Sequence, residues 1–200
     1  MKMMMERTAI KIESMLSFCA LEEGTDEFVG VLIATIFEKS QWYLKREQGE
    51  TLRQVRKLKL HAIAKANFFN TIDADKSLCI DILCVKPDHQ KKGIGTALLR
   101  SCIARASNIA SACVGQFTSN AAQTIAKRLH FEVIYELPYK ELEFENVRFQ
   151  PFEECHPKNY SIACMALRIS PPQLPIPPPP SLSTIIPRST SKKKNAKKKK

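Results

Sequence analysis

Long hydrophobic runs are missing from this 200-residue chain. No stretch of about 20 apolar residues occurs, so the sequence predicts no membrane-spanning helix. Internal repeats with a period of about 20–50 residues are also missing, which excludes solenoids and propellers. The chain is nevertheless 44% hydrophobic, and this excludes disorder throughout its length. We expect one folded domain of ordinary size with some residues left over.

Cysteine pairs with the spacing C-x-x-C are absent, although the chain has seven cysteines. Most of these cysteines lie inside apolar runs, such as residues 78–80 and 83–85. An odd number of cysteines without a cleavable signal peptide argues against a disulfide framework. Cys155 and His156 are adjacent, but no further ligand has metal-binding spacing, so no metal site is predicted. We therefore expect reduced thiols in a cytoplasmic protein.

Acidic residues are absent from residues 171–200, which hold Arg188 and seven lysines. The many prolines of residues 171–187 favour an extended chain that cannot build a core. The sequence thus predicts a domain over residues 1–170 and a disordered Pro-rich and Lys-rich tail over residues 171–200. Because most of the net charge of +11 lies in this tail, the charge is weak evidence for nucleic-acid binding by the domain. The lysine block is either a solvated end or a segment for nuclear import or for binding nucleic acid or anionic surfaces.

Residues 1–170 show the hydrophobic periodicities of mixed α and β structure. Two apolar runs joined by a turn-rich link predict an antiparallel hairpin. We expect strands over residues 16–21, 28–37, 78–85, 112–114, 131–137 and 160–169, helices over residues 43–69, from 93 onward and over 121–129, and a long loop over residues 138–159.

Residues 82–99 carry the strongest functional signal in the chain. An apolar strand ends at Val85, a short basic loop follows, and a helix opens at residues 93–95. Backbone N–H groups at a helix start have no partner within the helix, and the helix dipole adds positive potential there. Glycines let a phosphate approach these groups because no Cβ intervenes, and Lys91 and Lys92 add charge. The segment therefore predicts a diphosphate site.

Three phosphate-binding motifs can be compared with this loop. The Walker pattern G-x-x-x-x-G-K-[ST] is absent, and the dinucleotide pattern G-x-G-x-x-G fails because Leu98 stands at its third glycine. The acyl-CoA pattern [QR]-x-x-G-x-[GA] is matched by residues 90–95 at each fixed position. The alternative is that Gly93 and Gly95 form only a tight turn between strand and helix.

From residue 16 to residue 169 the chain resembles the GNAT superfamily of N-acetyltransferases, and more narrowly the insect-type arylalkylamine (dopamine) N-acetyltransferases. Residues 80–88 are similar to the family's fourth strand and its exit, and residues 67–70 to the end of a helix in the narrower group. Residues 127–132 resemble the family's K-x-G-F-E ending, with His130 in place of glycine. The resemblance implies an α/β (α+β) acyl-CoA N-acyltransferase fold. In that fold a central twisted mixed sheet, flanked by helices, splays beside the strand that ends at Val85.

The resemblance also implies roles for individual residues. The backbone of Leu83, Cys84 and Val85 would pair with the pantetheine arm of acetyl-CoA, and the N–H near Val85 would polarise the thioester carbonyl. Ser119 matches a position that commonly contacts the cofactor, although a plain N-cap explains this serine equally well. The remaining cofactor contacts would be the backbone amides of the diphosphate loop: Gln90, Lys91, Lys92, Gly93, Ile94, Gly95 and Thr96.

The activity implied by the resemblance is direct attack of a small primary amine, such as an arylalkylamine, on acetyl-CoA in a ternary complex without a metal. Two departures from the family stand out: Ala126 occupies the position of a general-acid tyrosine, and residues 1–14 are too short for the family's first strand and helices. We therefore expect an N-terminally truncated domain with an unassigned general base. The alternative function is an impaired relative that binds CoA or acts through its tail, and peptide acetylation also stays open.

Asp81 lies inside the apolar strand before the loop. A carboxylate in such a strand needs a partner. Two interpretations stand: Asp81 faces the amine site from inside the sheet, or it makes a structural hydrogen bond.

Overall fold

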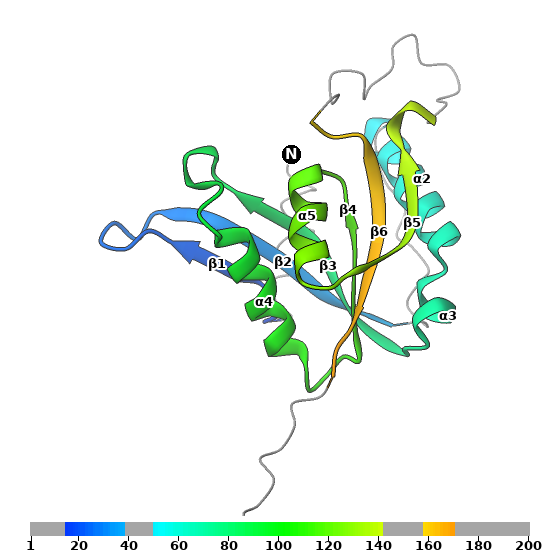
Figure 1. Cartoon of the computed structure of the whole chain (residues 1–200), viewed down its shortest axis with the longest axis horizontal. Coiled ribbons are helices and arrows are strands. Elements are labelled where there is room, and N and C mark those ends of the chain that lie inside the picture. The colour runs from blue at the N-terminus through cyan, green and yellow to red at the C-terminus, as the bar shows by residue number, and fades with distance from the viewer. Residues whose placement is uncertain (1–14, 39–49, 142–157, 171–200) are drawn as a thin grey trace, which may run out of the picture.

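The structure is a computed structural model, and it describes residues 15–38, 50–141 and 158–170. In this part of the chain six strands form one mixed sheet in the order β1-β2-β3-β4-β6-β5, with helices on both faces (Figure 1). In chain order the elements are β1 (Phe18–Leu21), β2 (Phe28–Glu38), α2 (Glu50–Ala66), α3 (Phe68–Ile72), β3 (Lys76–Val85), the 3-10 helix η2 (Pro87–His89), α4 (Ile94–Ala106), β4 (Ala112–Phe117), α5 (Asn120–Arg128), β5 (Glu132–Pro138), the 3-10 helix η3 (Tyr139–Glu141) and β6 (Ser161–Arg168).

The predicted mixed α and β architecture is confirmed. Strands β1 and β2 form the expected antiparallel hairpin, and β3 and β4 run parallel, joined through α4. The strand predicted at residues 112–114 is longer than expected, because β4 continues to Phe117. Gln116 interrupts the apolar run that the sequence shows, yet it is half-buried and donates from Nε2 to the carbonyl of Lys59 in α2 at 2.8 Å. Backbone pairing with β6 continues as far as Phe117, which pairs with Ala163, and so extends the strand past its apolar segment.

The single helix predicted over residues 43–69 is wrong in its C-terminal part. Helix α2 ends at Ala66, Asn67 has a φ of 46°, and α3 follows as a separate helix. Asparagine tolerates this left-handed backbone better than most residues, and one such residue is enough to redirect a helix. Residues 43–49 lie outside the described residues, as does most of the predicted loop over 138–159, apart from η3 and the residues before β6.

The predictions for the two chain ends also fall outside the described residues. Residues 1–14, on which the expected truncation rests, and the predicted tail over 171–200 are not described. The same holds for Cys155 and His156. Among the described helices, none combines the length and the hydrophobicity that a transmembrane span requires.

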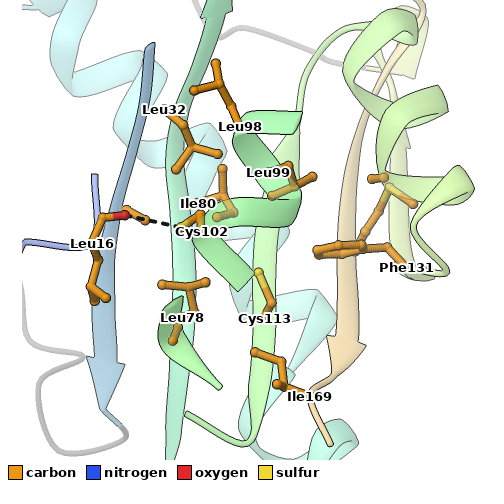
Figure 2. Packing of buried hydrophobic residues seen from close by; sticks show 14 of the residues in the cluster. Leu16, Leu32, Leu78, Ile80, Leu98, Leu99, Cys102, Cys113, Phe131 and Ile169 are labelled. Carbon is orange, nitrogen blue, oxygen red and sulfur yellow. Dashed lines mark hydrogen bonds between the residues drawn. The ribbon is translucent and has the colours of Figure 1, made fainter. Parts of the chain in front are cut away.

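Two hydrophobic clusters hold the layers together, one on each face of the sheet. The first packs α4 and α5 against the sheet and includes Leu78, Leu99 and Met165, which are fully buried. In this cluster the Cys102 thiol donates to the carbonyl oxygen of Leu16 at 3.2 Å, so the segment before β1 is tied to α4 (Figure 2). The second cluster packs α2 and α3 against the opposite face and consists of Leu58, Ala62, Ala66, Phe68, Ile72, Ala74, Ala112, Val114, Leu137, Tyr139, Ile162, Cys164 and Ala166.

The sheet splays between β3 and β4, as the family resemblance implies. Pairing between these parallel strands runs from Ser77 opposite Ala112 to Ile80 opposite Gly115 and ends there. Beyond Ile80, β3 continues to Val85 paired with β2, whereas β4 continues paired with β6. The end of β3 therefore has β2 on one side and, in the described part of the chain, no strand on the other.

Gly115 lies at the last pair before the strands separate. A Cβ at this position would lie 3.0 Å from Cε2 and 3.1 Å from Cζ of Phe117, and 3.4 Å from Cβ of Ile80. Such distances require the neighbours to shift. The Phe117 ring is itself held edge-on by Phe131, with ring centroids 5.6 Å apart. The absence of a side chain at Gly115 therefore leaves room for the Phe117 ring, which lies on the α4 and α5 face of the sheet.

The turn between α5 and β5 forms without the family's glycine. His130 takes a φ of 66°, and the N–H groups of His130 and Phe131 donate to the carbonyls of Lys127 and Ala126, both at 3.0 Å. This pair of bonds is the Schellman arrangement, whose left-handed position favours glycine. The substitution by histidine thus leaves the turn geometry intact and adds backbone strain.

Replacing His130 with glycine should therefore stabilise the fold. The left-handed backbone costs a residue with a Cβ about 1–2 kcal/mol, while glycine loses about 0.5–1 kcal/mol through the entropy of the unfolded chain. The expected net gain is about 0.5–1 kcal/mol in the free energy of unfolding, measured by chemical denaturation. His130→Ala keeps the Cβ and should show no such gain. Equal stability of the glycine and alanine variants would contradict this assignment of strain.

Candidate functional site

The loop between β3 and α4 is fixed by hydrogen bonds to the end of the strand. Gln90 donates from Nε2 to the carbonyl oxygen of Val85 at 3.1 Å, and its N–H bonds to the carbonyl of Pro87 at 3.2 Å. Between these bonds the chain makes the short helix η2, which begins at Pro87. The first fixed residue of the predicted motif thus closes the loop onto the strand.

Gly93 is the N-cap residue of α4 and has a φ of 83°. A Cβ at this position would meet no atom within 4 Å, so the backbone conformation, and not crowding, favours glycine here. No side chain caps the helix at this residue, and the N–H groups of the first turn are left for another acceptor. Lys91 and Lys92 are exposed beside them. This arrangement fits an anion at the start of α4.

The hairpin turn before β2 contacts the same loop through its acidic residues. Lys86 forms an ion pair with Glu27, and Nε2 of His89 lies 3.6 Å from a carboxylate oxygen of Glu22. The hydrogen bond from Lys86 and its positive charge lower the pKa of the Glu27 carboxyl. Because Lys86 is paired with Glu27, the unpaired basic charge nearest in sequence to the start of α4 would come from Lys91 and Lys92.

The backbone of β3 offers hydrogen-bonding groups to the splay. Lys86 donates its N–H to the carbonyl of Val29 at 2.8 Å, so its backbone groups face β2. Successive residues of a strand alternate in direction, which turns the backbone groups of Val85 and Leu83 away from β2. The carbonyl of Val85 confirms this direction, since it accepts from the Gln90 side chain on the far side. Leu83 and Val85 therefore face the splay, whereas the backbone groups of Cys84 face β2.

The sequence predicts that the backbone of Leu83, Cys84 and Val85 pairs with the cofactor, and the direction of the strand limits this prediction to Leu83 and Val85. Cys84 is exposed, but only its side chain is available, because its N–H and C=O lie on the side of β2. Val85 and Leu83 remain predicted pantetheine contacts. Since β3 and β4 are parallel, the end of β4 opens at the same edge of the sheet as this loop.

Ser119 lies at that edge, two residues after β4. Its Oγ accepts a hydrogen bond from the N–H of Ala122 at 3.2 Å, which makes it the N-cap of α5. The structural interpretation of this serine is therefore confirmed, and its predicted contact with a cofactor stays a prediction. Its hydroxyl hydrogen can still be donated while the oxygen accepts.

A buried polar network behind Ser119 was missed by sequence reasoning. Gln123 is 1% exposed and donates from Nε2 to the carbonyls of Phe117 and Ser161 and to the Ser161 hydroxyl, each at 3.2 Å. The Ser161 hydroxyl in turn donates to Glu136 at 2.5 Å. Within the described residues, the Oε1 atom of Gln123 is buried without a hydrogen-bond partner. The network fixes the end of β4 to α5, β6 and β5 and so frames one wall of the splay.

The only available sequence signal for this network was the position of Gln123. It lies three residues before Ala126 on a helix of 9 residues, so both residues share the buried face of α5. Ala126, which the resemblance places at the position of the family's general-acid tyrosine, is fully buried. The hydroxyl of Tyr139 donates to the carbonyl of Thr118 at 2.6 Å.

Of the described cysteines, Cys79 is half-buried, and the others are either exposed or buried. Cys19 and Cys84 are exposed. Burial raises the pKa of the Cys102 thiol to about 12 and that of the Cys164 thiol to about 11. Burial also raises the pKa of Cys113 well above its usual range, with a smaller contribution from the neighbouring thiols. In the described residues no group of three or more His, Cys, Asp or Glu side chains could hold a metal ion.

Alkylation by iodoacetamide at pH 8 should therefore separate these two groups. Only the thiolate reacts, and at pH 8 a thiol with a pKa of 11–12 is about 0.1–0.01% ionised. We expect Cys19 and Cys84 to be labelled at least about a hundredfold faster than Cys102, Cys113 and Cys164, as measured by peptide mass spectrometry. Labelling after unfolding in guanidinium is the control for intrinsic reactivity. Rapid labelling of Cys113 in the native protein would contradict the burial described here.

Comparisons with known proteins agree with this fold. Residues 17–133 match the family model described as an acetyltransferase (GNAT) domain. Among solved structures, arylalkylamine N-acetyltransferase 2 from Aedes aegypti is similar at 19% identity over 85% of this chain and 81% of its own, with a TM-score of 0.72. A polyamine N-acetyltransferase from Drosophila melanogaster is similar at 16% identity over 82% and 79%, with a TM-score of 0.66. A search of curated proteins gave no match.

Proposed function

The chain belongs to the GNAT acetyltransferase family, and we propose that it transfers the acetyl group of acetyl-CoA to a small primary amine, with arylalkylamines as the first class to test. The observation that carries this proposal is the splay between β3 and β4, which opens directly beside the loop at the start of α4. An anion site and an unpaired strand edge at one opening fit a long cofactor with a diphosphate at one end. The names of the similar solved structures, which include arylalkylamine and polyamine N-acetyltransferases, support an amine as the acceptor.

Binding of the cofactor would use mainly the backbone. The N–H groups from Gln90 to Thr96 would hold the diphosphate at the start of α4, with Lys91 and Lys92 adding positive charge. The pantetheine arm would lie along β3 as an additional strand and pair with the backbone of Leu83 and Val85. Ser119 at the start of α5 would contact the arm from the other wall of the splay.

The reaction would be direct attack of the neutral amine on the thioester carbon. A C–N bond forms, the C–S bond breaks, and the proton of the amine leaves with a base that the described residues do not identify. During attack, negative charge develops on the carbonyl oxygen. The N–H of Val85, which faces the splay, is the donor that would stabilise this charge.

The experiment that tests the proposal measures product and not only CoA release. Purified full-length chain is incubated with acetyl-CoA and dopamine, serotonin, tyramine or agmatine, and the N-acetylated amine is detected by mass spectrometry. Product formation that saturates with the amine would support the proposal. Binding of acetyl-CoA in calorimetry without any product would contradict it.

That second outcome would favour a CoA-binding protein without transferase activity. The observation in its favour is Ala126, because a buried methyl group cannot donate a proton to the leaving thiolate. A general acid or base contributes about 10²–10⁴ in rate, so its absence slows the reaction without preventing binding.

A further inference from the structure

The turn between β1 and β2 is closed by hydrogen bonds among its own residues. The carbonyl of Glu22 accepts from the N–H groups of Thr25 and Asp26 at 3.4 and 3.1 Å, and the N–H of Glu22 donates to the carbonyl of Glu27 at 2.9 Å. The hydroxyl of Thr25 also donates to Oε2 of the Glu22 side chain at 3.1 Å. One carboxylate oxygen of Glu22 is therefore held by the turn, and this fixes the direction of the other oxygen.

The other carboxylate oxygen of Glu22 faces the loop between β3 and α4. It lies 3.6 Å from Nε2 of His89, the last residue of η2. Strands β2 and β3 are antiparallel, with Gly30 opposite Val85, so the turn before β2 and the loop after β3 lie at the same end of the sheet (Figure 1). The His89 side chain is 17% exposed and that of Glu22 is 43% exposed. The contact therefore joins a largely covered imidazole to a carboxylate that the turn positions.

The charged groups around His89 come from the turn and from its own loop: Glu22, Glu27, Lys86, Asp88, Lys91 and Lys92. The hydrogen bond and charge of Lys86 lower the pKa of the Glu27 carboxyl, and His89 adds a smaller contribution in the same direction. Because Glu27 is paired with Lys86, Glu22 is the carboxylate of the turn that serves His89. A histidine gains its positive charge as the pH falls through about 6.5, so the attraction to Glu22 is present below this range and is lost above it.

His89 directly precedes the residues that would hold the diphosphate. Its N–H donates to the carbonyl of Lys86 at 3.0 Å, and the next residue, Gln90, bonds to the carbonyls of Pro87 and Val85. A loop that is already held in its binding conformation loses less entropy when the ligand binds. A contact that orders η2 therefore favours the cofactor. The charge of a protonated imidazole acts in the same direction, because it attracts the diphosphate.

We propose that Glu22 and His89 position the diphosphate loop for acetyl-CoA, an inference that rests on the proposed transferase function. Glu22 acts through His89, and His89 acts through the loop that it precedes, so both are positioning residues and neither takes part in the chemical step. Their contact is strongest when His89 is protonated. The affinity for acetyl-CoA should therefore rise as the pH falls from about 8 to about 5.5. The kcat at a fixed pH and saturating acetyl-CoA should not depend on either residue.

The test measures the Kd of acetyl-CoA by calorimetry at pH values of about 8 and 5.5 for the wild type, His89→Gln and Glu22→Gln. Because each substitution also changes the local charge, the quantity compared is the ratio of the Kd at the higher pH to the Kd at the lower pH. We expect this ratio to be about threefold to fivefold larger in the wild type than in His89→Gln, as for a partly exposed ion pair. The titration of the cofactor's own phosphate is common to all proteins and cancels. Glu22→Gln keeps the imidazole without its partner and should lose at least about half of the difference.

His61→Gln is the matched control, since it removes an exposed histidine from α2 and should leave the ratio of the wild type unchanged. A ratio in His89→Gln equal to that of the wild type would overturn the role of His89. A wild-type ratio in Glu22→Gln would mean that His89 acts through its charge alone, and would overturn the pair. A folded wild type that binds acetyl-CoA at neither pH overturns the proposed function itself.

Discussion

Replacing Gly93 with aspartate is expected to weaken acetyl-CoA binding by at least about a hundredfold in calorimetry. The side chain would project into open space at the start of α4, since no atom lies within 4 Å of its Cβ position. Two like charges about 4 Å apart repel by about 4 kcal/mol at an effective dielectric constant of 20, which corresponds to about a thousandfold in affinity. Solvent screening reduces this value, but a large loss remains because the diphosphate would bind at this position.

The chain offers a matched control for this variant. Gly24, in the turn between β1 and β2, has a φ of 86° and also meets no atom within 4 Å of a Cβ. Gly24→Asp therefore adds the same charge and the same backbone strain away from the start of α4, and should change the Kd less than about threefold. Gly93→Ala carries the strain alone, about 1–2 kcal/mol, and should lie between the two. Equal losses of affinity in both aspartate variants would contradict a diphosphate site at Gly93.

Local chemistry is the part of this protein that the sequence could predict. Between residues 82 and 99 the signals are an apolar strand, a loop that matches the acyl-CoA pattern, and glycines at the start of a helix. The interactions that hold this segment are local, since the bond from Gln90 to Val85, which the structure adds, spans five residues. The strands of the sheet could be predicted for the same reason, because the hydrophobic pattern of each strand is local.

The parts that could not be predicted depend on contacts between distant segments. The hydroxyl of Thr35 reaches Asp81 across 46 residues, and the amide of Gln123 reaches Ser161 across 38. The pairing of β3 with β2 also skips Asp81, because Ile33 pairs with Ile82 and Ala34 with Ile80, and this bulge has no signature in its own strand. The sequence therefore left Asp81 with two interpretations. The structure shows the hydrogen bond of the structural interpretation, and a role of Asp81 at the amine site stays a prediction.

Removal of one backbone N–H should have the second large effect, on kcat instead of binding. An amide-to-ester replacement at Val85 substitutes oxygen for this N–H and leaves the side chain unchanged. If the N–H of Val85 stabilises the charge that develops on the thioester oxygen, its loss should lower kcat about a hundredfold to a thousandfold. The KM for acetyl-CoA should rise much less, because the interaction strengthens mainly in the transition state. Steady-state kinetics with tyramine separate the two parameters.

The neighbouring residue supplies the control, because strand alternation points its N–H the other way. Lys86 donates to the carbonyl of Val29 at 2.8 Å, so an ester at Lys86 removes a bond between β3 and β2. This change should cost about 1 kcal/mol of folding free energy and leave kcat within about threefold of the wild type. A similar fall in kcat for both esters would mean that the strand end only needs to be ordered, and would contradict a specific role for Val85. A fall confined to the Val85 ester would identify the first catalytic donor of this site.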